Sequence, residues 1–377
     1  MTHFDISNRL NKLRKRMAVE GVEAFIVLKS VNVEYLSGFD AIRDNSNPHA
    51  VLVTSDEARF TTDARYLEVA QDQAMTDQIW QVDNPGTGLI PKDLHEVWNL
   101  QNFKSIAVED SLNYRDFVHI EESVKPAAVV AARSWVEDIR SVKDAAEIKR
   151  IKEAQAITDR VFAHLCSFIA AGQSEKEIAL ETEYQVRKLG AEGTSFSPIV
   201  ASGPNGSLPH AVPSDRILQA GDLLTIDFGA SYGGYCSDMT RTIFIGGTDD
   251  AGNPLTPSDE QHAVYAAVLA AQLASLAAVK DGVSGKVVDA AGRKIIADAG
   301  YGDYFVHGTG HGVGLYIHEL PNSSQRSEVK LKAGEVLTVE PGIYLPGKLG
   351  VRIEDMVVVE EEGSLNITQS PKELLVV

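Results

Sequence analysis

Residues 225–242, TIDFGASYGGYCSDMTRT, contain two β-forming runs separated by the Gly-Gly dipeptide at 233–234. A two-residue loop of this composition is a strong β-hairpin signal, because glycine tolerates the positive φ angles that such turns require. A hairpin closed by these two glycines places Asp227 opposite Thr240. Asp227 and Asp238 then become diagonal neighbours on one sheet face, with backbones ~7–8 Å apart. The segment therefore predicts a pair of carboxylates that reach one point.

A second hairpin is predicted by residues 339–355, VEPGIYLPGKLGVRIED. Gly347 is the midpoint between Glu340 and Glu354, and a symmetric turn about it places the two glutamates directly opposite each other, roughly 4.5–5.5 Å apart. The neighbouring runs LLTI, VLTV and MVVV are apolar, which indicates that both hairpins are buried. Together the two hairpins predict four acidic groups in one apolar pocket.

Four buried carboxylates repel one another unless cations neutralise them. One interpretation is that Arg241 and Arg352 form structural salt bridges with the acids. The other adds His311, from the glycine-rich segment HGTGHGVGL at 307–315, as a nitrogen ligand. Four carboxylates and one imidazole suit two divalent cations that share carboxylates, and such a pair activates water for hydrolysis. The number of acids beside the histidine-rich segment favours this second interpretation.

The chain is long enough for two domains. Residues 1–137 alternate helix and strand and predict a small mixed α/β domain that begins with a basic amphipathic helix. The stretch EDIRSVKDAAEIKRI at 137–151 predicts the start of one long helix. We place the boundary at Asp138, so that the second domain spans 138–377.

An internal repeat is indicated within the second domain. Residues 170–190 resemble residues 279–300, with Gly172 and Ser174 matching Gly282 and Ser284. Ser174 and Glu177 have the spacing of a capping box, and glycines at 190 and 300 are expected at the helix ends. Each copy follows a long helix and precedes a carboxylate hairpin. The predicted fold is α+β, with a pseudo-twofold second domain.

Composition narrows the class of protein further. The net charge of −18 argues against nucleic acid or an anionic membrane surface as the main partner. The two cysteines imply no disulfide framework, charges interrupt any signal peptide, and a reducing cytoplasm is the expected compartment. The apolar stretch at 264–279 is short for a membrane span and contains Gln272 and Ser275, which predicts a buried helix.

The segments IDFGA, GGYCSDMTRT, HGTGHGVGL, IHE, VEPGIY and VRIED resemble the motif set of the pita-bread metallopeptidases. That family includes methionine aminopeptidase, Xaa-Pro aminopeptidase and Xaa-Pro dipeptidase (prolidase). The resemblance covers roughly residues 140–375. NVEYLSGF and FTTDARYLEVA in the first domain resemble the creatinase-type amino-terminal domain of the proline-directed branch. A peptide with proline at its second position is therefore the expected substrate.

The resemblance implies a cofactor of two divalent metal ions. Manganese is favoured by the oxygen-rich ligand set, with cobalt and zinc as alternatives. By this resemblance Asp227 chelates one metal, Asp238 and Glu354 bridge both, and His311 and Glu340 complete the second. Glu340 is also the implied general base in hydrolysis by a metal-bridged hydroxide.

The resemblance also implies substrate contacts. His210 and His318 are expected to stabilise the developing oxyanion and to position the scissile amide. His307, Tyr344 and Arg352 match positions that line the pocket for the residue after the cut. A homodimer is the family expectation, and no feature of composition indicates it.

Four functions compete. A Xaa-Pro aminopeptidase acting on longer peptides is favoured modestly over a Xaa-Pro dipeptidase, which needs a group that clamps the terminal carboxylate of a dipeptide. Arg352 does not decide between them, because it matches an arginine in both branches. Creatinase shares the fold but lacks the acidic ligands. A binding module with a degraded site is disfavoured by the intact set of five ligand positions and by the absence of basic tails.

Overall fold

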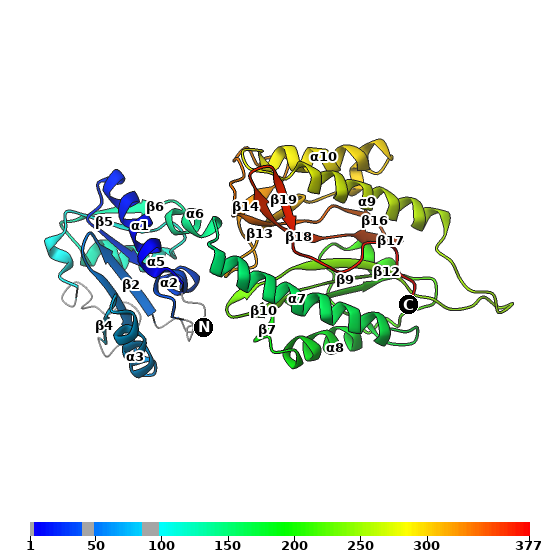
Figure 1. The fold of residues 1–377 in the computed structure, drawn as a ribbon, viewed down its shortest axis with the longest axis horizontal. Coiled ribbons are helices and arrows are strands. Elements are labelled where there is room, and N and C mark those ends of the chain that lie inside the picture. Colours follow the sequence, from blue (N-terminus) through cyan, green and yellow to red (C-terminus); the bar gives the residue numbers. More distant parts are fainter. Residues whose placement is uncertain (1–3, 40–48, 85–97) are drawn as a thin grey trace. The chain divides into compact units, whose positions relative to one another are not determined.

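The computed structural model describes residues 4–39, 49–84 and 98–377. The chain forms two compact units, residues 1–140 and 141–377 (Figure 1). The prediction that one long helix begins at residue 137 is wrong. The structure has two helices there, because α6 (Trp135–Ser141) ends before α7 (Ala145–Phe168) begins. The physical reason is Asp144, whose side chain accepts hydrogen bonds from the backbone N–H groups of Ala146 and Glu147 and so starts a new helix with a capping box.

The first unit is built on a six-stranded mixed sheet in the order β4-β3-β2-β1-β5-β6. Its strands are β1 (Ala24–Val27), β2 (His49–Thr54), β3 (Ala58–Thr62), β4 (Gln81–Asp83), β5 (Ser105–Glu109) and β6 (Ala128–Ala132). Its other helices are α1 (Ile6–Glu20), α2 (Ser30–Ser37), α3 (Leu67–Asp77) and α5 (Tyr114–Ser123). The basic first helix buries Leu10, Leu13 and Met17, and its Lys12, Lys15 and Arg16 are exposed. Arg9 is the exception, since it is buried and donates to Tyr35 O at 2.8 Å.

The second unit places sheets between two pairs of helices, with α9 (Asp259–Ala278) and α10 (Gly285–Asp298) on one side and α7 with α8 (Glu175–Lys188) on the other (Figure 1). One three-stranded sheet contains β8 (Ile199–Ser202), β9 (Leu223–Phe228) and β12 (Met239–Phe244), and another contains β7 (Gly193–Thr194), β10 (Ala230–Tyr232) and β11 (Tyr235–Cys236). The remaining strands are β13 (Gly310–Gly312), β14 (Glu319–Ser323), β15 (Val336–Val339), β16 (Gly342–Leu345), β17 (Leu349–Arg352), β18 (Asp355–Glu360) and β19 (Gly363–Asn366).

The expected α+β fold with an internal repeat is confirmed. Helix pair α7 and α8 corresponds to α9 and α10, and backbone bonds repeat with them: Gly172 N–H donates to Leu218 O, and Gly282 N–H donates to Leu331 O. The capping box at Ser174 is present. Gly190 and Gly300 follow their helices with φ of 98° and 86°, the left-handed conformation that favours glycine after a helix.

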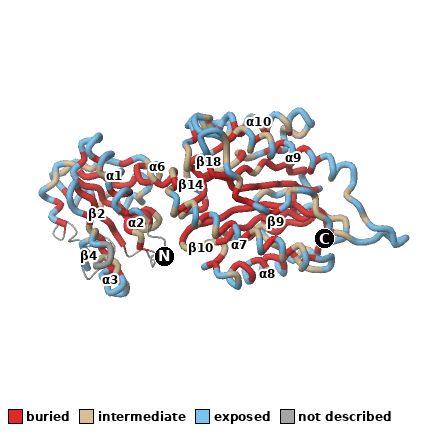
Figure 2. Tube along the Cα trace, viewed as in Figure 1, coloured by how far each residue is buried: buried red, intermediate tan, exposed pale blue. Residues whose placement is uncertain are grey.

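Helix α9 is a core helix of the second unit. Among the described residues it is the one helix long and apolar enough to cross a membrane by length and composition. Its Val264, Val268 and Ala271 pack in a buried cluster with Ile296 of α10, while its polar Gln272 and Ser275 are also buried. Between the helix layers, the central strands are wholly buried, namely β9, β12, β15, β16 and β17 (Figure 2). The burial predicted for residues 264–279 thus holds along one face of α9, since Ala266, Ala270 and Leu273 are exposed.

Candidate active site

The first carboxylate hairpin forms with the predicted register. Tyr232 pairs with Tyr235, and Asp227 pairs with Thr240. The two glycines between the tyrosines have φ of 55° and 85°, as a type I′ turn requires. The pairings on either side of Gly229 and Asp238 have the same register, so Asp227 and Asp238 lie diagonally on one face.

The second hairpin is symmetric about Gly347, as predicted. Gly342 pairs with Arg352 on the turn side, and Val339 pairs with Asp355 on the other side. Both pairings have the same midpoint, so Glu340 and Glu354 lie opposite each other between them. Apolar strands flank this point, and Glu354 is 1% exposed.

Contacts between the hairpins hold their acids in one cluster. Thr240 Oγ1 donates a 2.7 Å hydrogen bond to Glu354 Oε2, and the backbone N–H of Glu354 donates to Thr240 O at 3.1 Å. Met356 lies two residues beyond Glu354, and its Sδ accepts from the backbone N–H of Asp238 at 3.1 Å. Four acids from two distant segments therefore share one buried site.

His311 faces the acids from β13. Its Nδ1 lies 3.1 Å from Gly312 O, which assigns the proton to Nδ1 and leaves Nε2 with a free lone pair. That Nε2 lies 3.6 Å from Asp238 Oδ2 and 3.4 Å from Glu340 Oε1. Burial lowers the pKa of His311, so the neutral ring is favoured. A neutral imidazole with an exposed lone pair is the form that ligates metals.

The two arginines considered as structural partners behave differently. Arg352 Nη2 contacts Asp227 Oδ2 at 2.7 Å, so one acid of the cluster is paired. Arg241 instead pairs with Asp355 at 2.8 Å, and Asp355 is completely buried. Burial would raise the pKa of Asp355, but the charges of Arg241 and Lys372 lower it overall. The salt-bridge interpretation therefore accounts for Asp227 alone.

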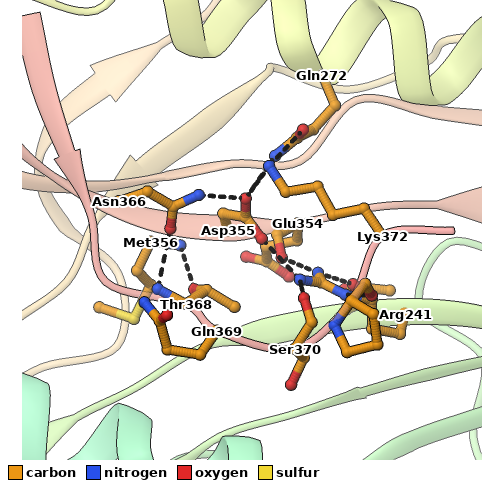
Figure 3. A network of polar contacts seen from close by, with 12 residues as sticks. Arg241, Gln272, Glu354, Asp355, Met356, Asn366, Thr368, Gln369, Ser370 and Lys372 are labelled. Atoms are coloured by element: carbon orange, nitrogen blue, oxygen red, sulfur yellow. Dashed lines mark hydrogen bonds and ion pairs between the residues drawn. The ribbon is translucent and has the colours of Figure 1, made fainter.

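Asp355 is the centre of a polar network behind the site (Figure 3). Lys372 Nζ lies 2.5 Å from its Oδ2, and Asn366 Nδ2 donates to the same oxygen at 2.6 Å. Arg241 also donates through Nη1 to the carbonyl oxygens of Thr240 and Glu354, one from each hairpin. This network fixes the backbone of both hairpins where their acids meet.

The remaining acids lack compensation. Burial, followed by the charges of Glu354, Asp227 and Glu340, raises the pKa of Asp238 well above its ordinary value. Burial and the neighbouring carboxylates likewise raise the pKa of Glu354, and burial raises that of Glu340. Within the described residues, the buried oxygens Asp227 Oδ1 and Glu354 Oε1 have no hydrogen-bond partner. A buried acceptor without a donor is costly, and a bound cation would satisfy both oxygens.

The cluster lines a cavity of about 670 Å³. An apolar wall is contributed by Phe196, Pro198, Ile199, Pro209, Ala211, Val212, Pro213 and Ile317. The predicted site residues His210, His307, His318 and Arg352 also line it. The rings of His311 and His318 lie 4.4 Å apart between centroids. The cavity thus combines an acidic floor, several imidazoles and a proline-rich wall.

Tyr344 is placed differently from the other predicted site residues. Its hydroxyl accepts from Arg352 Nη1 at 2.7 Å and donates to His307 Nε2 at 2.8 Å, given that His307 Nδ1 lies 2.7 Å from Gly308 O. It is not among the residues that line the cavity. Burial raises the pKa of Tyr344 to about 12, so it stays a neutral donor. Tyr344 therefore orients His307 and Arg352 from behind.

Sequence reasoning missed three residues. Thr240 and Thr338 donate to Glu354 and Glu340, and Thr338 also accepts from the N–H of His311 at 3.0 Å. Alternation offers a signal for both, because each lies two residues from a predicted acid on its strand. Arg326 also lines the cavity. Its loop carries no motif that would have selected it.

Comparison with known proteins agrees with this geometry. Residues 149–361 match the model of metallopeptidase family M24, and residues 9–142 match the creatinase/prolidase N-terminal domain. A Xaa-Pro dipeptidase of Pyrococcus furiosus is 36% identical over 98% of this chain and 100% of its own length. The chain belongs to metallopeptidase family M24, with the pita-bread catalytic domain that the motifs indicated.

Two solved structures match this chain over nearly its whole length. A Xaa-Pro dipeptidase from Bacillus anthracis is 38% identical, has a TM-score of 0.90, and is matched over 99% of this chain and 100% of its own. An X-Pro aminopeptidase from Thermotoga maritima is 37% identical, has a TM-score of 0.84, and is matched over 97% and 99% of the two chains. The protein is thus an enzyme, a metallopeptidase with both family domains.

Proposed function

We propose that the protein is a Xaa-Pro dipeptidase, which hydrolyses the amide bond before proline in a dipeptide. The observation that carries this proposal is the cavity itself. An acid cluster suited to divalent cations lies beside a proline-rich apolar wall and one arginine, Arg326, that is available to a substrate carboxylate. The dipeptidases from P. furiosus and B. anthracis support the same function.

The proposed cofactor is a pair of divalent metal ions, with manganese favoured. Asp227, Asp238, His311, Glu340 and Glu354 would hold it, and the two unpartnered buried oxygens fit this assignment. When bound, such ions acidify water and polarise a carbonyl group. The oxygen-rich donor set favours manganese over metals that prefer sulfur.

The chain's own residues supply proton transfer and orientation. Glu340 is positioned by Thr338 Oγ1, which donates to its Oε1 at 3.1 Å. There its carboxylate would accept a proton from water and pass it to the leaving proline nitrogen. Burial lowers the pKa of His318, which favours its neutral form. His318 and His210 would then donate hydrogen bonds to the oxyanion and the scissile amide.

Selectivity for proline follows from the chemistry of its amide. A Xaa-Pro amide has no N–H, so a site that requires that donor would reject it. The wall formed around Pro209, Ala211, Val212 and Pro213 offers apolar contact instead. A proline ring in this position buries apolar area without leaving a polar group unpaired.

The length of the substrate depends on which cation binds its terminal carboxylate. Arg352 and Arg326 are the permanent cations among the residues that line the cavity. Arg352 already contacts Asp227, Tyr344 and Thr240. The Arg326 guanidinium makes no hydrogen bond or ion pair with the described part of the chain. The terminal carboxylate of a Xaa-Pro dipeptide belongs to the proline directly after the scissile bond, and it would pair with Arg326. A longer peptide has an uncharged amide at that position.

The second candidate is the Xaa-Pro aminopeptidase that the sequence favoured. The similarity to the T. maritima X-Pro aminopeptidase supports it. Arg326 is also exposed, so the cavity is open on the side where a longer peptide would leave. Turnover of Ala-Pro beside Ala-Pro-Ala distinguishes the two functions, because each predicts the opposite preference.

Removal of metal should abolish turnover. Chelation leaves the acid cluster without compensation and the reaction without its activated water. We expect loss of Ala-Pro hydrolysis on treatment with a chelator, followed by recovery when manganese or cobalt is added in excess. Hydrolysis that persists in metal-depleted protein, verified by elemental analysis, would contradict the assignment.

Substitution of Arg326 should change substrate length preference. A hydrogen bond to a charged group contributes about 1.5–3 kcal/mol, so Arg326→Gln should raise KM for Ala-Pro by roughly 10- to 100-fold. Arg326→Lys should lose less, because it keeps the charge. Ala-Pro-amide lacks the carboxylate and provides the control, since its KM should be the same for all three proteins. Equal losses for the acid and the amide would exclude a carboxylate clamp.

A further inference from the structure

Glu175 is a fully buried carboxylate at the start of α8 that the proposed reaction does not use. Its Oε1 accepts from the N–H and the hydroxyl of Ser202 at 2.7 and 2.8 Å. Its Oε2 accepts from the N–H and the hydroxyl of Ser214 at 3.0 and 2.6 Å. Asn205 Nδ2 lies 3.1 Å from both oxygens. One anion therefore gathers donors from both ends of the segment 202–214.

That segment contains functional parts of the cavity. Pro209, Ala211, Val212 and Pro213 form much of the apolar wall, and His210 lies among them. Its middle has further anchors, because Arg352 Nη1 donates to Pro209 O and the N–H of Gly347 donates to Ser207 Oγ, each at 3.2 Å. Among these anchors, Arg352 holds the wall at Pro209, and Glu175 holds both ends of the segment at Ser202 and Ser214.

The second repeat holds its equivalent segment in another way. Glu175 N–H donates to Arg216 O, and the matching Gly285 N–H donates to Val329 O, so the two helix starts occupy the same place in each repeat. At Gly285 a Cβ atom would lie 2.1 Å from Asn322 O. At the helix start, direct backbone packing therefore contacts the second segment, whereas a side-chain carboxylate contacts the first.

We propose that Glu175 is a positioning residue that sets the proline-binding wall and His210 relative to the acid cluster, and so determines selectivity for proline. The inference rests on the proposed function. Nothing equivalent is expected of the second repeat, because Gly285 has no side chain to remove. The carboxylate holds the segment through four donors on serine residues, and each serine presents both an N–H and a hydroxyl.

Glu175→Gln removes this arrangement with little change in shape. An amide has one acceptor oxygen, and its NH₂ group would face the donors of either Ser202 or Ser214. One end of the segment would lose its anchor, since a buried donor facing another donor is unfavourable. We expect KM for Ala-Pro to rise about tenfold and the preference for Ala-Pro over Ala-Ala to shrink. Metal content and affinity should stay unchanged, because no acid of the cluster is altered.

The control is Glu177→Gln on the same turn of α8. Glu177 is exposed and bonds Ser174, so its substitution tests helix capping alone. This variant should keep both the KM and the preference for proline. Two results for Glu175→Gln would exclude the positioning role. One is a loss of hydrolysis of Ala-Pro and Ala-Ala in equal proportion to a loss of folded protein. The other is an unchanged KM for Ala-Pro together with an unchanged preference for Ala-Pro over Ala-Ala.

Hydrogen exchange separates this inference from the proposed function. In Glu175→Gln, amides at 203–213 should exchange faster than in the parent protein, while those at 316–326 in the second repeat should not change. Failure of the parent protein to cleave Ala-Pro would reject the proposed function, and the exchange pattern would still decide the role of Glu175. Unchanged exchange at 203–213 would overturn the inference.

Discussion

Glu340→Gln should lower kcat for Ala-Pro by about 10³-fold while the protein stays folded. The amide keeps the size of the side chain and can still accept from Thr338 Oγ1, but it cannot take a proton from water. Substrate contacts through the apolar wall and Arg326 are unaffected, so KM should change by only a few fold. Steady-state kinetics with saturating manganese, together with metal analysis, measure both effects.

Glu335→Gln is the matched control for this substitution. Glu335 is also buried, and it directly precedes β15, the strand that ends just before Glu340. It accepts from Ser141 Oγ at 3.2 Å and does not line the cavity. Its loss should reduce stability without lowering kcat of the folded fraction. A kcat for Glu340→Gln within tenfold of the parent value, at full metal content, would remove Glu340 from the role of base.

The sequence predicted the parts of the site that are determined locally. In each hairpin a short loop fixes the register, so the spacing of two acids on one strand pair follows from counting residues. The positions of Asp227, Asp238, Glu340 and Glu354 in their hairpins were predictable for this reason. The helix repeat was predictable as well, because capping residues and glycines mark helix ends within a few residues.

Contacts between distant segments were not predictable in this way. Asp355 bonds Arg241, which lies 114 residues away in the sequence, although Arg241 had been considered as a partner for the site acids. Arg326 comes to the cavity because its loop follows β14, where Asn322 pairs with His311. Glu175 meets Ser202 and Ser214 only after α8 packs on its sheet. Each of these depends on tertiary packing, and spacing in the sequence carries no signal for it.

Asp238→Asn should have opposite effects on the metal-free and metal-loaded protein. Without metal, the cluster holds several buried acids against the single charge of Arg352, and the pKa of Asp238 is raised because burial and its neighbours oppose its ionised form. A neutral amide removes part of that repulsion. We therefore expect the free energy of unfolding of the metal-free variant to exceed that of the metal-free parent by an amount on the order of 1 kcal/mol. Its melting temperature should be higher accordingly.

With metal the order should reverse. An attraction between unit charges at about 4 Å near a protein surface contributes about 4 kcal/mol, which corresponds to a roughly 10³-fold change in affinity. The variant should therefore bind manganese much more weakly and show little rise in melting temperature when manganese is added, whereas the parent should show a large rise. Melting curves in chelator and in manganese measure both halves of the prediction. Equal metal-induced stabilisation of the two proteins would show that Asp238 is no ligand. A less stable metal-free variant would instead show that Asp238 has a structural role, because removing one of several repelling charges should not by itself destabilise the protein.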